Sequence, residues 1–171
     1  MFKEIEIESN FELPYKLIDI NERNEHFVFE FKCFDNKQTD YSVQAGGVTG
    51  RFEVIYTCRG IESQFECDIT IGNVYEFYNE LKGAYKDING KDLSVCLKNY
   101  GEVLKRSRLV IDFDKLGHCI LSGNFKNKDN YYKCGIDFEI EIDQTYILNF
   151  LGALEAFFNE LKRIQGHCNF Y

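Results

Sequence analysis

The sequence has few of the features that mark disordered, secreted or membrane-spanning chains. It contains one proline and no tryptophan in 171 residues, and 44% of its residues are hydrophobic, which is typical of a folded globular protein. No apolar run approaches the roughly 20 residues that span a bilayer. The segment "MFKEIEIES" is charged from its third residue and has no apolar signal region. We therefore expect a cytoplasmic protein without a membrane partner.

The cysteines lack the spacing of a metal site. There are seven, an odd number, and any two lie at least nine residues apart, so no C-x-x-C pair occurs. A structural zinc site needs closely spaced ligand pairs. In a cytoplasmic chain the pattern predicts reduced, mostly buried cysteines. No metal and no cofactor is expected.

Motifs of catalysis are also missing. The chain has no G-x-G-x-x-G, no phosphate-binding G-x-x-x-x-G-K-[ST], no G-x-S-x-G and no H-E-x-x-H. Its three histidines are His26, His118 and His167. His118 directly precedes Cys119, and neighbouring residues of a strand point to opposite faces, so the two do not form a nucleophile–base pair. Only a Cys–His pair assembled across the fold stays open, and we predict that the chain is not an enzyme.

Positive charge is in deficit. Lys and Arg number 20 against 28 Asp and Glu, which gives a formal net charge of −8. Nucleic acids and anionic membrane surfaces attract positively charged proteins, so neither is an expected partner. An acidic chain is instead steered toward a basic protein, although the charge also serves solubility.

Aromatic residues and alternating patterns are abundant and favour β-structure. Sixteen Phe and 11 Tyr make up 16% of the chain. Period-two alternation predicts strands at 2–9, 26–34, 41–58 (two strands around a Gly46-Gly47 turn), 63–71 and 93–97, and three antiparallel strands within 107–142. Turns are expected near Lys115–Gly117 and at "NKDN" (127–130).

Helical spacing appears twice. The segment "NVYEFYNELKGAY" (73–85) is apolar on one face, and Asn73 followed by Glu76 has the spacing of a capping box. The segment 143–164 has the wider apolar face, with Asp143 as the expected N-cap. We therefore predict two amphipathic helices, each packed on a sheet.

The two helices follow similar strands. The segments "FECDITIGNVYEFYNELKGAY" and "FEIEIDQTYILNFLGALEAFF" both begin with Phe-Glu in an alternating strand and turn directly into a helix. We expect an α+β fold with antiparallel β-sheets and two amphipathic helices, arranged as two β-β-α units after an N-terminal β-region. The chain reads as a single domain over 1–171, with strands in 1–62, a strand and helix in 63–92, and strands and a helix in 93–171.

The strand "GIDFEIEI" carries a row of carboxylates on one face. Asp137, Glu139 and Glu141, which we call the acidic stripe, alternate with buried-type residues. A turn centred on Lys128–Asp129 places Glu139 opposite His118 and Asp137 opposite Ile120. This register predicts a Glu139–His118 contact and no cation in the facing strand. We predict the acidic stripe as a docking surface for a basic partner.

A second carboxylate pair lies on another predicted strand. Asp112 and Asp114 share one strand face, which sets them roughly 7 Å apart. That separation is near the range for the two acids of a glycosidase. Nothing around the pair supplies a pocket signature, and a solvated face is the simpler interpretation.

The C-terminal part resembles a known family. The segments "DFDKLGHCILSGNF" and "GIDFEIEIDQTYILNFLGALEAFF", within residues 112–161, resemble the WapI-like immunity proteins of bacterial polymorphic toxin systems, and Asp143-Gln144-Thr145 is the most specific part. The resemblance implies a cytoplasmic, non-catalytic inhibitor that binds the toxic domain of a cognate toxin, often a nuclease. A nuclease is usually basic where it holds nucleic acid, so an acidic inhibitor can occupy that surface.

Two other functions stay open. One is a small-molecule-binding or enzymatic domain with an aromatic-lined cavity, which predicts a closed pocket with convergent polar groups. The other is a structural module, such as a homo-oligomer, which predicts an extended apolar patch. An inhibitor predicts salt-sensitive association with a basic protein domain. The sequence alone does not identify that partner.

Overall fold

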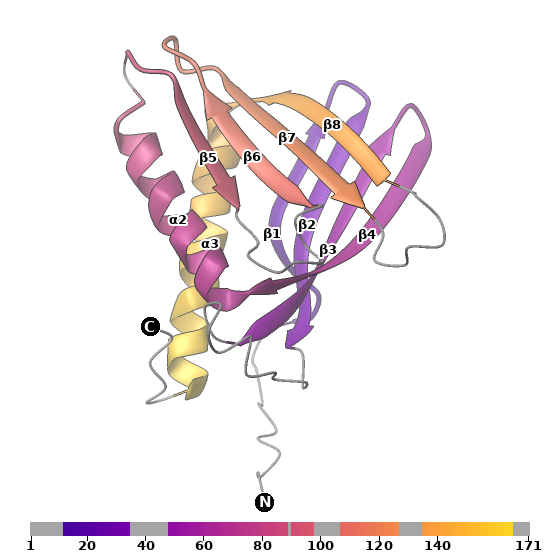
Figure 1. Cartoon of the computed structure of the whole chain (residues 1–171), viewed down its shortest axis with the longest axis vertical. Helices are drawn as coiled ribbons and strands as arrows, with labels where there is room; N and C mark the ends of the chain where they lie inside the picture. Colours follow the sequence, from indigo (N-terminus) through magenta and orange to yellow (C-terminus); the bar gives the residue numbers. More distant parts are fainter. Residues whose placement is uncertain (1–11, 35–47, 89, 98–106, 127–134, 166–171) are drawn as a thin grey trace, which may run out of the picture.

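The chain folds into two antiparallel sheets with both helices on one side (Figure 1). The computed structural model describes residues 12–34, 48–88, 90–97, 107–126 and 135–165. Within these residues there are eight strands and two helices, and each sheet has four strands. The predicted α+β class is confirmed. The strand predicted at 2–9 and the turns at Gly46-Gly47 and 127–130 lie outside the described residues.

Sheet A is a meander of four strands paired in chain order. They are β1 (Tyr15–Glu22), β2 (Glu25–Phe34), β3 (Thr49–Cys58) and β4 (Ile61–Thr70). Turns at Arg23-Asn24 and Arg59-Gly60 join two of the hairpins, and all four residues have positive φ, as two-residue hairpin turns favour. Alternation then directs Phe27, Phe29 and Phe31 of β2 into the core.

Sheet B repeats this plan. Its strands are β5 (Leu93–Leu97), β6 (Arg108–Phe113), β7 (Cys119–Lys126) and β8 (Gly135–Ile142), again paired in chain order. The three antiparallel strands predicted within 107–142 are confirmed. So is the turn near 115–117, where the Gly117 amide donates to the Asp114 carbonyl at 3.0 Å.

The predicted register between β7 and β8 is wrong. Glu139 lies opposite Ser122 and Asp137 lies opposite Asn124, instead of opposite His118 and Ile120. The difference is four residues along β7. An even shift leaves every side chain on the same face of the sheet, so the hydrophobic pattern fixes the faces and does not fix the register.

Helix α2 (Ile71–Lys86) begins earlier than predicted. Its N-cap is Thr70, whose hydroxyl accepts a hydrogen bond from the Asn73 amide at 3.4 Å. The predicted Asn73 cap is wrong, because β4 continues into the helix without a loop and Asn73 is buried in the first turn. The predicted apolar face packs inward, with Val74, Phe77, Tyr78 and Leu81 buried.

Helix α3 (Gln144–Gln165) begins where predicted. The Asp143 carboxylate accepts a hydrogen bond from the Thr145 amide at 2.7 Å, which confirms its role as the cap. Hydrogen bonds from the amide and hydroxyl of Thr145 lower the pKa of Asp143. The buried stripe of the helix comprises Ile147, Phe150, Leu154, Phe157, Phe158 and Leu161.

Each sheet and the helix that follows it form one repeat of the fold. The units are β1–β2–β3–β4–α2 and β5–β6–β7–β8–α3, so the predicted β-β-α motifs are the last parts of larger units. The expected boundary at 62/63 falls inside β4. The helices are exchanged between units, because α2 packs along β5 of sheet B and α3 packs along β1 of sheet A.

Aromatic rings join the sheets and helices into one core. Phe138 of β8 contacts Phe27 of β2 at a centroid distance of 4.9 Å and Tyr56 of β3 at 5.1 Å. Phe157 of α3 contacts Phe31 of β2 at 5.1 Å. The buried residues of both sheets and both helices belong to a single hydrophobic cluster. The outer faces of the sheets carry polar side chains together with some apolar ones, such as Val28 and Ile120.

Candidate functional site

The acidic stripe lies on the outer face of β8, the edge strand of sheet B. Asp137, Glu139 and Glu141 are all exposed, while the intervening Phe138, Ile140 and Ile142 are buried. The alternation that predicted the stripe therefore describes β8 correctly. The packing of Phe138 on sheet A fixes which face of β8 points outward.

The three carboxylates of the stripe have different partners. Asp137 accepts a hydrogen bond from the side-chain amide of Asn124 in β7. Glu141 forms an ion pair with Arg23, from the turn between β1 and β2, at 3.2 Å. Glu139 lies opposite Ser122 and makes no hydrogen bond or ion pair with any described residue. It is therefore the carboxylate most available to another molecule.

The Arg23–Glu141 ion pair is exposed and contributes little to stability. The Arg23 side chain is 79% exposed and the Glu141 side chain is 58% exposed. Such surface pairs contribute roughly 0–1 kcal/mol and are screened by salt. A cation from a partner can therefore replace Arg23 at little cost. The sequence did not predict this pair, because Arg23 lies in the other sheet.

The carboxylates Asp112 and Asp114 do not form the pair suggested by their spacing. Asp112 of β6 lies opposite Ile120 of β7, and Ile120 lies opposite Glu141 of β8. Asp112 is therefore on the same outer face as the acidic stripe. Asp114 lies beyond the end of β6, in the turn before β7. The two carboxylates thus have separate surroundings, and Asp112 is half-buried on the outer face.

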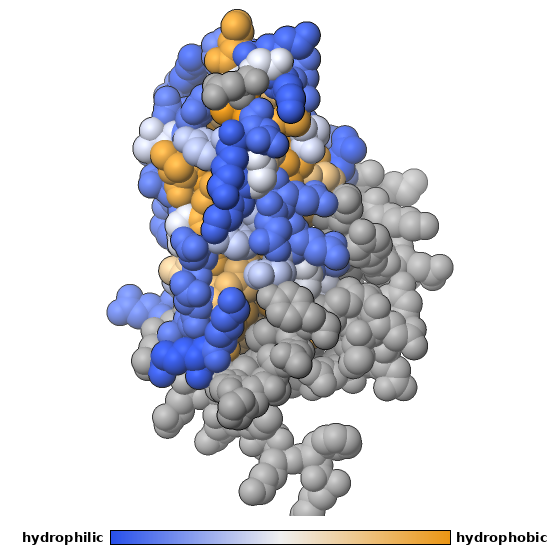
Figure 2. Space-filling view, turned by 90° about the vertical axis from the view of Figure 1, so that its left-hand side faces the viewer, coloured by the Kyte–Doolittle hydropathy of each residue, from blue (hydrophilic) through white to orange (hydrophobic). Residues whose placement is uncertain are grey.

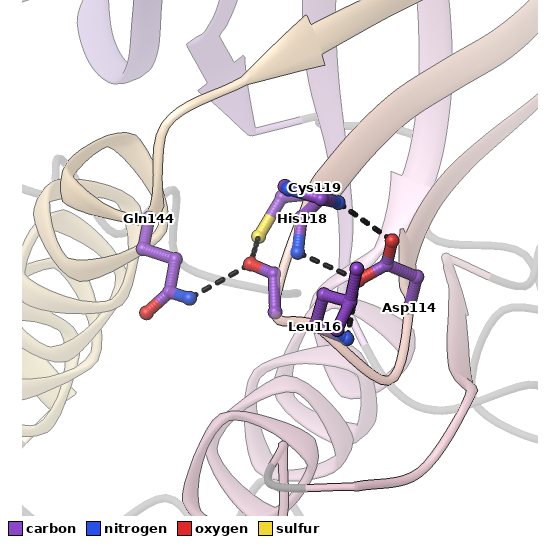
Figure 3. A network of polar contacts seen from close by, with 6 residues as sticks. Asp114, Leu116, His118, Cys119 and Gln144 are labelled. Carbon is purple, nitrogen blue, oxygen red and sulfur yellow. Dashed lines mark hydrogen bonds and ion pairs between the residues drawn. The ribbon is translucent and has the colours of Figure 1, made fainter.

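Asp114 organises the turn between β6 and β7 (Figure 3). Its Oδ1 atom accepts the amides of Leu116 at 2.8 Å and His118 at 2.9 Å, and its Oδ2 lies 2.7 Å from His118 Nδ1. Desolvation acts to raise the pKa of Asp114, but these hydrogen bonds outweigh it and lower the pKa. The predicted Glu139–His118 contact is wrong, because His118 pairs with Asp114 within its own turn.

Cys119 faces away from His118 and into the core. Its Sγ lies 3.7 Å from the carbonyl of Gly117, which also accepts the Gln144 side-chain amide at 2.7 Å (Figure 3). Burial, with the charges of Asp143 and Asp114, raises the pKa of the Cys119 thiol to about 11. The prediction that His118 and Cys119 do not pair is confirmed, and this thiol is poorly suited to act as a nucleophile.

Sequence reasoning missed a buried carboxylate pair on the outer face of sheet A. Glu30 of β2 and Glu53 of β3 lie directly opposite each other, and each residue is 4% exposed. Lys32 Nζ lies 3.5 Å from Glu30 Oε1 and 2.8 Å from Glu53 Oε2. The Gln64 side-chain amide donates to Glu53 at 2.5 Å. One sign was available, since Glu30 shares its face of β2 with the apolar Val28, which is also buried.

The two buried carboxylates differ in proton affinity. Burial, followed by hydrogen bonding to Glu53, raises the pKa of Glu30. Burial also acts to raise the pKa of Glu53, but hydrogen bonds from Lys32, Gln64 and Glu30 outweigh it and lower the pKa. Such a difference can serve acid–base catalysis. Here the pair is closed to solvent and balanced by Lys32, which favours a structural role.

The described part of the chain has neither a metal-binding cluster nor a membrane-spanning helix. Those residues contain no group of three or more His, Cys, Asp or Glu side chains placed to hold a metal ion. None of the described helices has the length and apolar character needed to cross a bilayer.

No protein-family model, curated protein or solved structure matches this chain. The resemblance of residues 112–161 to WapI-like immunity proteins therefore stays a prediction. The features that carry most information are the exposed acidic stripe on β8 and the buried Glu30–Glu53 pair.

Proposed function

We propose that this protein is a cytoplasmic, non-catalytic inhibitor of the immunity type, which binds and neutralises a basic toxin domain through the acidic stripe of β8. The single observation that carries the proposal is Glu139, an exposed carboxylate between two others with no partner among the described residues. The toxin domain would supply the missing cation.

Electrostatics supports a basic protein partner. Carboxylates at alternate positions of one strand are roughly 7 Å apart and act on a docking surface together. With a net charge of −8 the whole chain also attracts a basic protein before contact. A nuclease domain is a suitable class of partner, because its substrate-binding surface must be basic. Covering that surface would block the toxin without any chemistry by the inhibitor.

The two alternative functions receive less support. Aromatic side chains that could line a cavity instead contact one another, as in the pairs Phe29–Phe52 at 5.3 Å and Phe31–Phe52 at 5.4 Å. An oligomerising module would present a continuous apolar patch. On the side of the molecule that carries α2, hydrophobic areas are broken up by hydrophilic residues (Figure 2). The large exposed hydrophobic residues among those described are scattered, namely Leu13, Ile61, Leu116 and Leu148.

The proposal is tested by searching for a toxin gene immediately upstream of the gene for this chain, and by co-expressing the chain with the toxic domain found there. Wild-type protein should restore growth, and Glu139→Lys should weaken both rescue and the binding measured with purified proteins. Binding should also weaken as salt is raised, because the attraction is between exposed charges. A wild-type chain that neither binds nor neutralises the neighbouring toxin domain would contradict the proposal.

The matched control is Glu62→Lys on β4. Glu62 is exposed on the outer face of the other sheet, and its replacement changes the net charge of the chain by the same amount. If both variants weaken binding equally, only overall charge matters and the acidic stripe is not the interface. Loss confined to Glu139→Lys would locate the interface on β8.

A further inference from the structure

The edges of the two sheets are protected unequally. Helix α3 lies along β1, where Tyr146 donates to the Asn21 carbonyl at 3.3 Å and Tyr15 donates to the Ala153 carbonyl at 3.2 Å. Helix α2 lies along β5. The other two edge strands, β4 and β8, each lead directly into a helix at one end and extend away from the helices over the rest of their length (Figure 1). Each sheet therefore has one edge covered by a helix and one edge without a helix.

The edge of β8 is free of a helix, although β1 of the other sheet contacts β8 and Arg23 lies at its Glu141 end. Among the described residues, the ladder of β8 is formed with β7 alone. Every second residue of an edge strand points its N–H and C=O away from the sheet, where they can bond to an added strand. On the outer face of β4, Gln64 bonds to Glu53 and Asp68 pairs with Arg51 at 3.7 Å, much as Asp137 and Glu141 of β8 pair with Asn124 and Arg23.

The side chains of β8 specify what an added strand would look like. Residues of a new strand opposite Asp137 and Glu139 would lie on the outer face, where Lys or Arg gives favourable cross-strand pairs. The residues between them would point toward the core side, beside Phe138 and Ile140, and would be apolar. The molecule already contains one such pair, because the Arg23 guanidinium forms an ion pair with Glu141 at the end of β8.

A second copy of the chain fits this edge poorly. The outer positions 137, 139 and 141 of β8 are all acidic. If two β8 strands paired with their outer faces aligned, carboxylates would lie opposite carboxylates, and such pairs repel. Charged edges of this kind prevent self-association in many sheet proteins. Charge complementarity therefore selects a basic segment of a different protein.

We infer that β8 binds its partner by strand addition, taking an extended segment with alternating basic and apolar residues along the edge beside Asp137 and Glu139. The identity of the partner as a toxin domain rests on the proposed function, whereas the binding mode rests on the edge of β8. Main-chain hydrogen bonds would give the affinity, and the stripe would select the basic side chains.

The test uses the full chain and the peptide Lys-Val-Lys-Val-Lys, with Lys-Lys-Lys-Val-Val as a probe of equal charge. Binding is measured by NMR together with amide hydrogen exchange. The alternating peptide should slow the exchange of outward-pointing β8 amides and bind about tenfold more tightly than the other peptide. Glu139→Lys should weaken this binding about tenfold, and Glu62→Lys should leave it unchanged.

Two results would overturn the inference. Equal binding of both peptides would indicate charge attraction without strand addition, and so would an absence of protection in β8. Protection in β4 would place the strand-accepting edge on the other sheet. In either case the proposed function still stands if the wild-type chain neutralises the toxin. Conversely, protected β8 amides in a chain that fails to neutralise the toxin would overturn the proposed function and leave the strand-addition mode intact.

Discussion

On the outer face of sheet A, Glu30 and Glu53 are 4% exposed and bound to Lys32 and Gln64, whereas on the outer face of sheet B the acidic stripe is exposed and Glu139 is without a described partner. Both sets are carboxylates at outward-facing positions of strands whose intervening residues point into the core. Glu30 and Glu53 belong to central strands, where neighbours cover them from both sides, and the stripe belongs to an edge strand. Position in the sheet thus decides whether a carboxylate stabilises the fold or is available to a partner.

The largest effect is expected from removing the positive charge beside the buried carboxylates of sheet A. Replacing Lys32 with Met keeps an unbranched apolar stem and removes the ammonium group that lies between Glu30 and Glu53. Two buried carboxylates then lack their cation, and the free energy of unfolding should fall by about 3 kcal/mol. Urea denaturation at neutral pH measures the loss. A loss below about 0.5 kcal/mol would mean that the pair is solvated and that the two outer faces are alike.

A somewhat smaller effect is expected in the core beneath the acidic stripe. Gly123 lies opposite Phe138, and a Cβ built on it would approach the Phe138 ring to 2.6 Å. Gly123→Ala should therefore displace the ring from Phe27 and Tyr56 and lower the free energy of unfolding by about 2 kcal/mol. The charges of sheet B stay unchanged in this variant. Thermal denaturation measures the loss, and Gly152→Ala is the control, since nothing lies within 4 Å of that position.

The pH dependence of stability should distinguish Glu30 from Glu53. The pKa of Glu30 is raised above its usual 4.5, so its contribution to stability is full below pH 4.5 and is lost as pH rises through the folded-state value. Glu30→Gln cannot ionise and should gain stability relative to wild type as pH rises above 4.5. The difference should grow as pH rises, and denaturation between pH 4 and 8 measures it.

The pKa of Glu53 is lowered, so the sign is reversed. Its contribution is present above its usual value of 4.5 and is lost as pH falls through the lower folded-state value. Glu53→Gln should be less stable than wild type at neutral pH, and the difference should disappear in acid. Identical pH profiles for Glu30→Gln and Glu53→Gln would contradict the opposite pKa shifts of the two carboxyl groups.

Sequence patterns predicted the faces of the strands but not the contacts across them. Alternation placed Asp137, Glu139 and Glu141 on one face of β8, because a period of two follows from strand geometry. The β7–β8 register was wrong because a shift of four residues preserves that alternation. Glu30 and Glu53 are joined across the long connection between β2 and β3, whose pairing cannot be read from local patterns. For the same reason, Arg23 could not be foreseen as the partner of Glu141.

The helix starts show a similar limit of local signals. Asp143 was identified as a cap because an acidic residue directly precedes the apolar periodicity. Asn73 was misidentified because the true cap, Thr70, is also the last residue of a β-strand. When a strand continues directly into a helix, the pattern changes period without a loop. The boundary is then set by the packing of Ile71 in the core, which local sequence does not display.

The smallest expected effect sharpens the contrast between the faces. Glu139→Lys reverses an exposed charge that has no described partner, so the free energy of unfolding should change by less than about 0.5 kcal/mol. The same substitution should weaken binding to a basic partner, and this separation of stability from binding is what an edge-strand docking surface requires. Urea denaturation of the variant beside Lys32→Met makes the comparison direct. If Glu139→Lys destabilised the fold as much as Lys32→Met, the acidic stripe would contribute to the stability of the unbound sheet. A side chain that contacts only a partner makes no stabilising contact in the unbound protein.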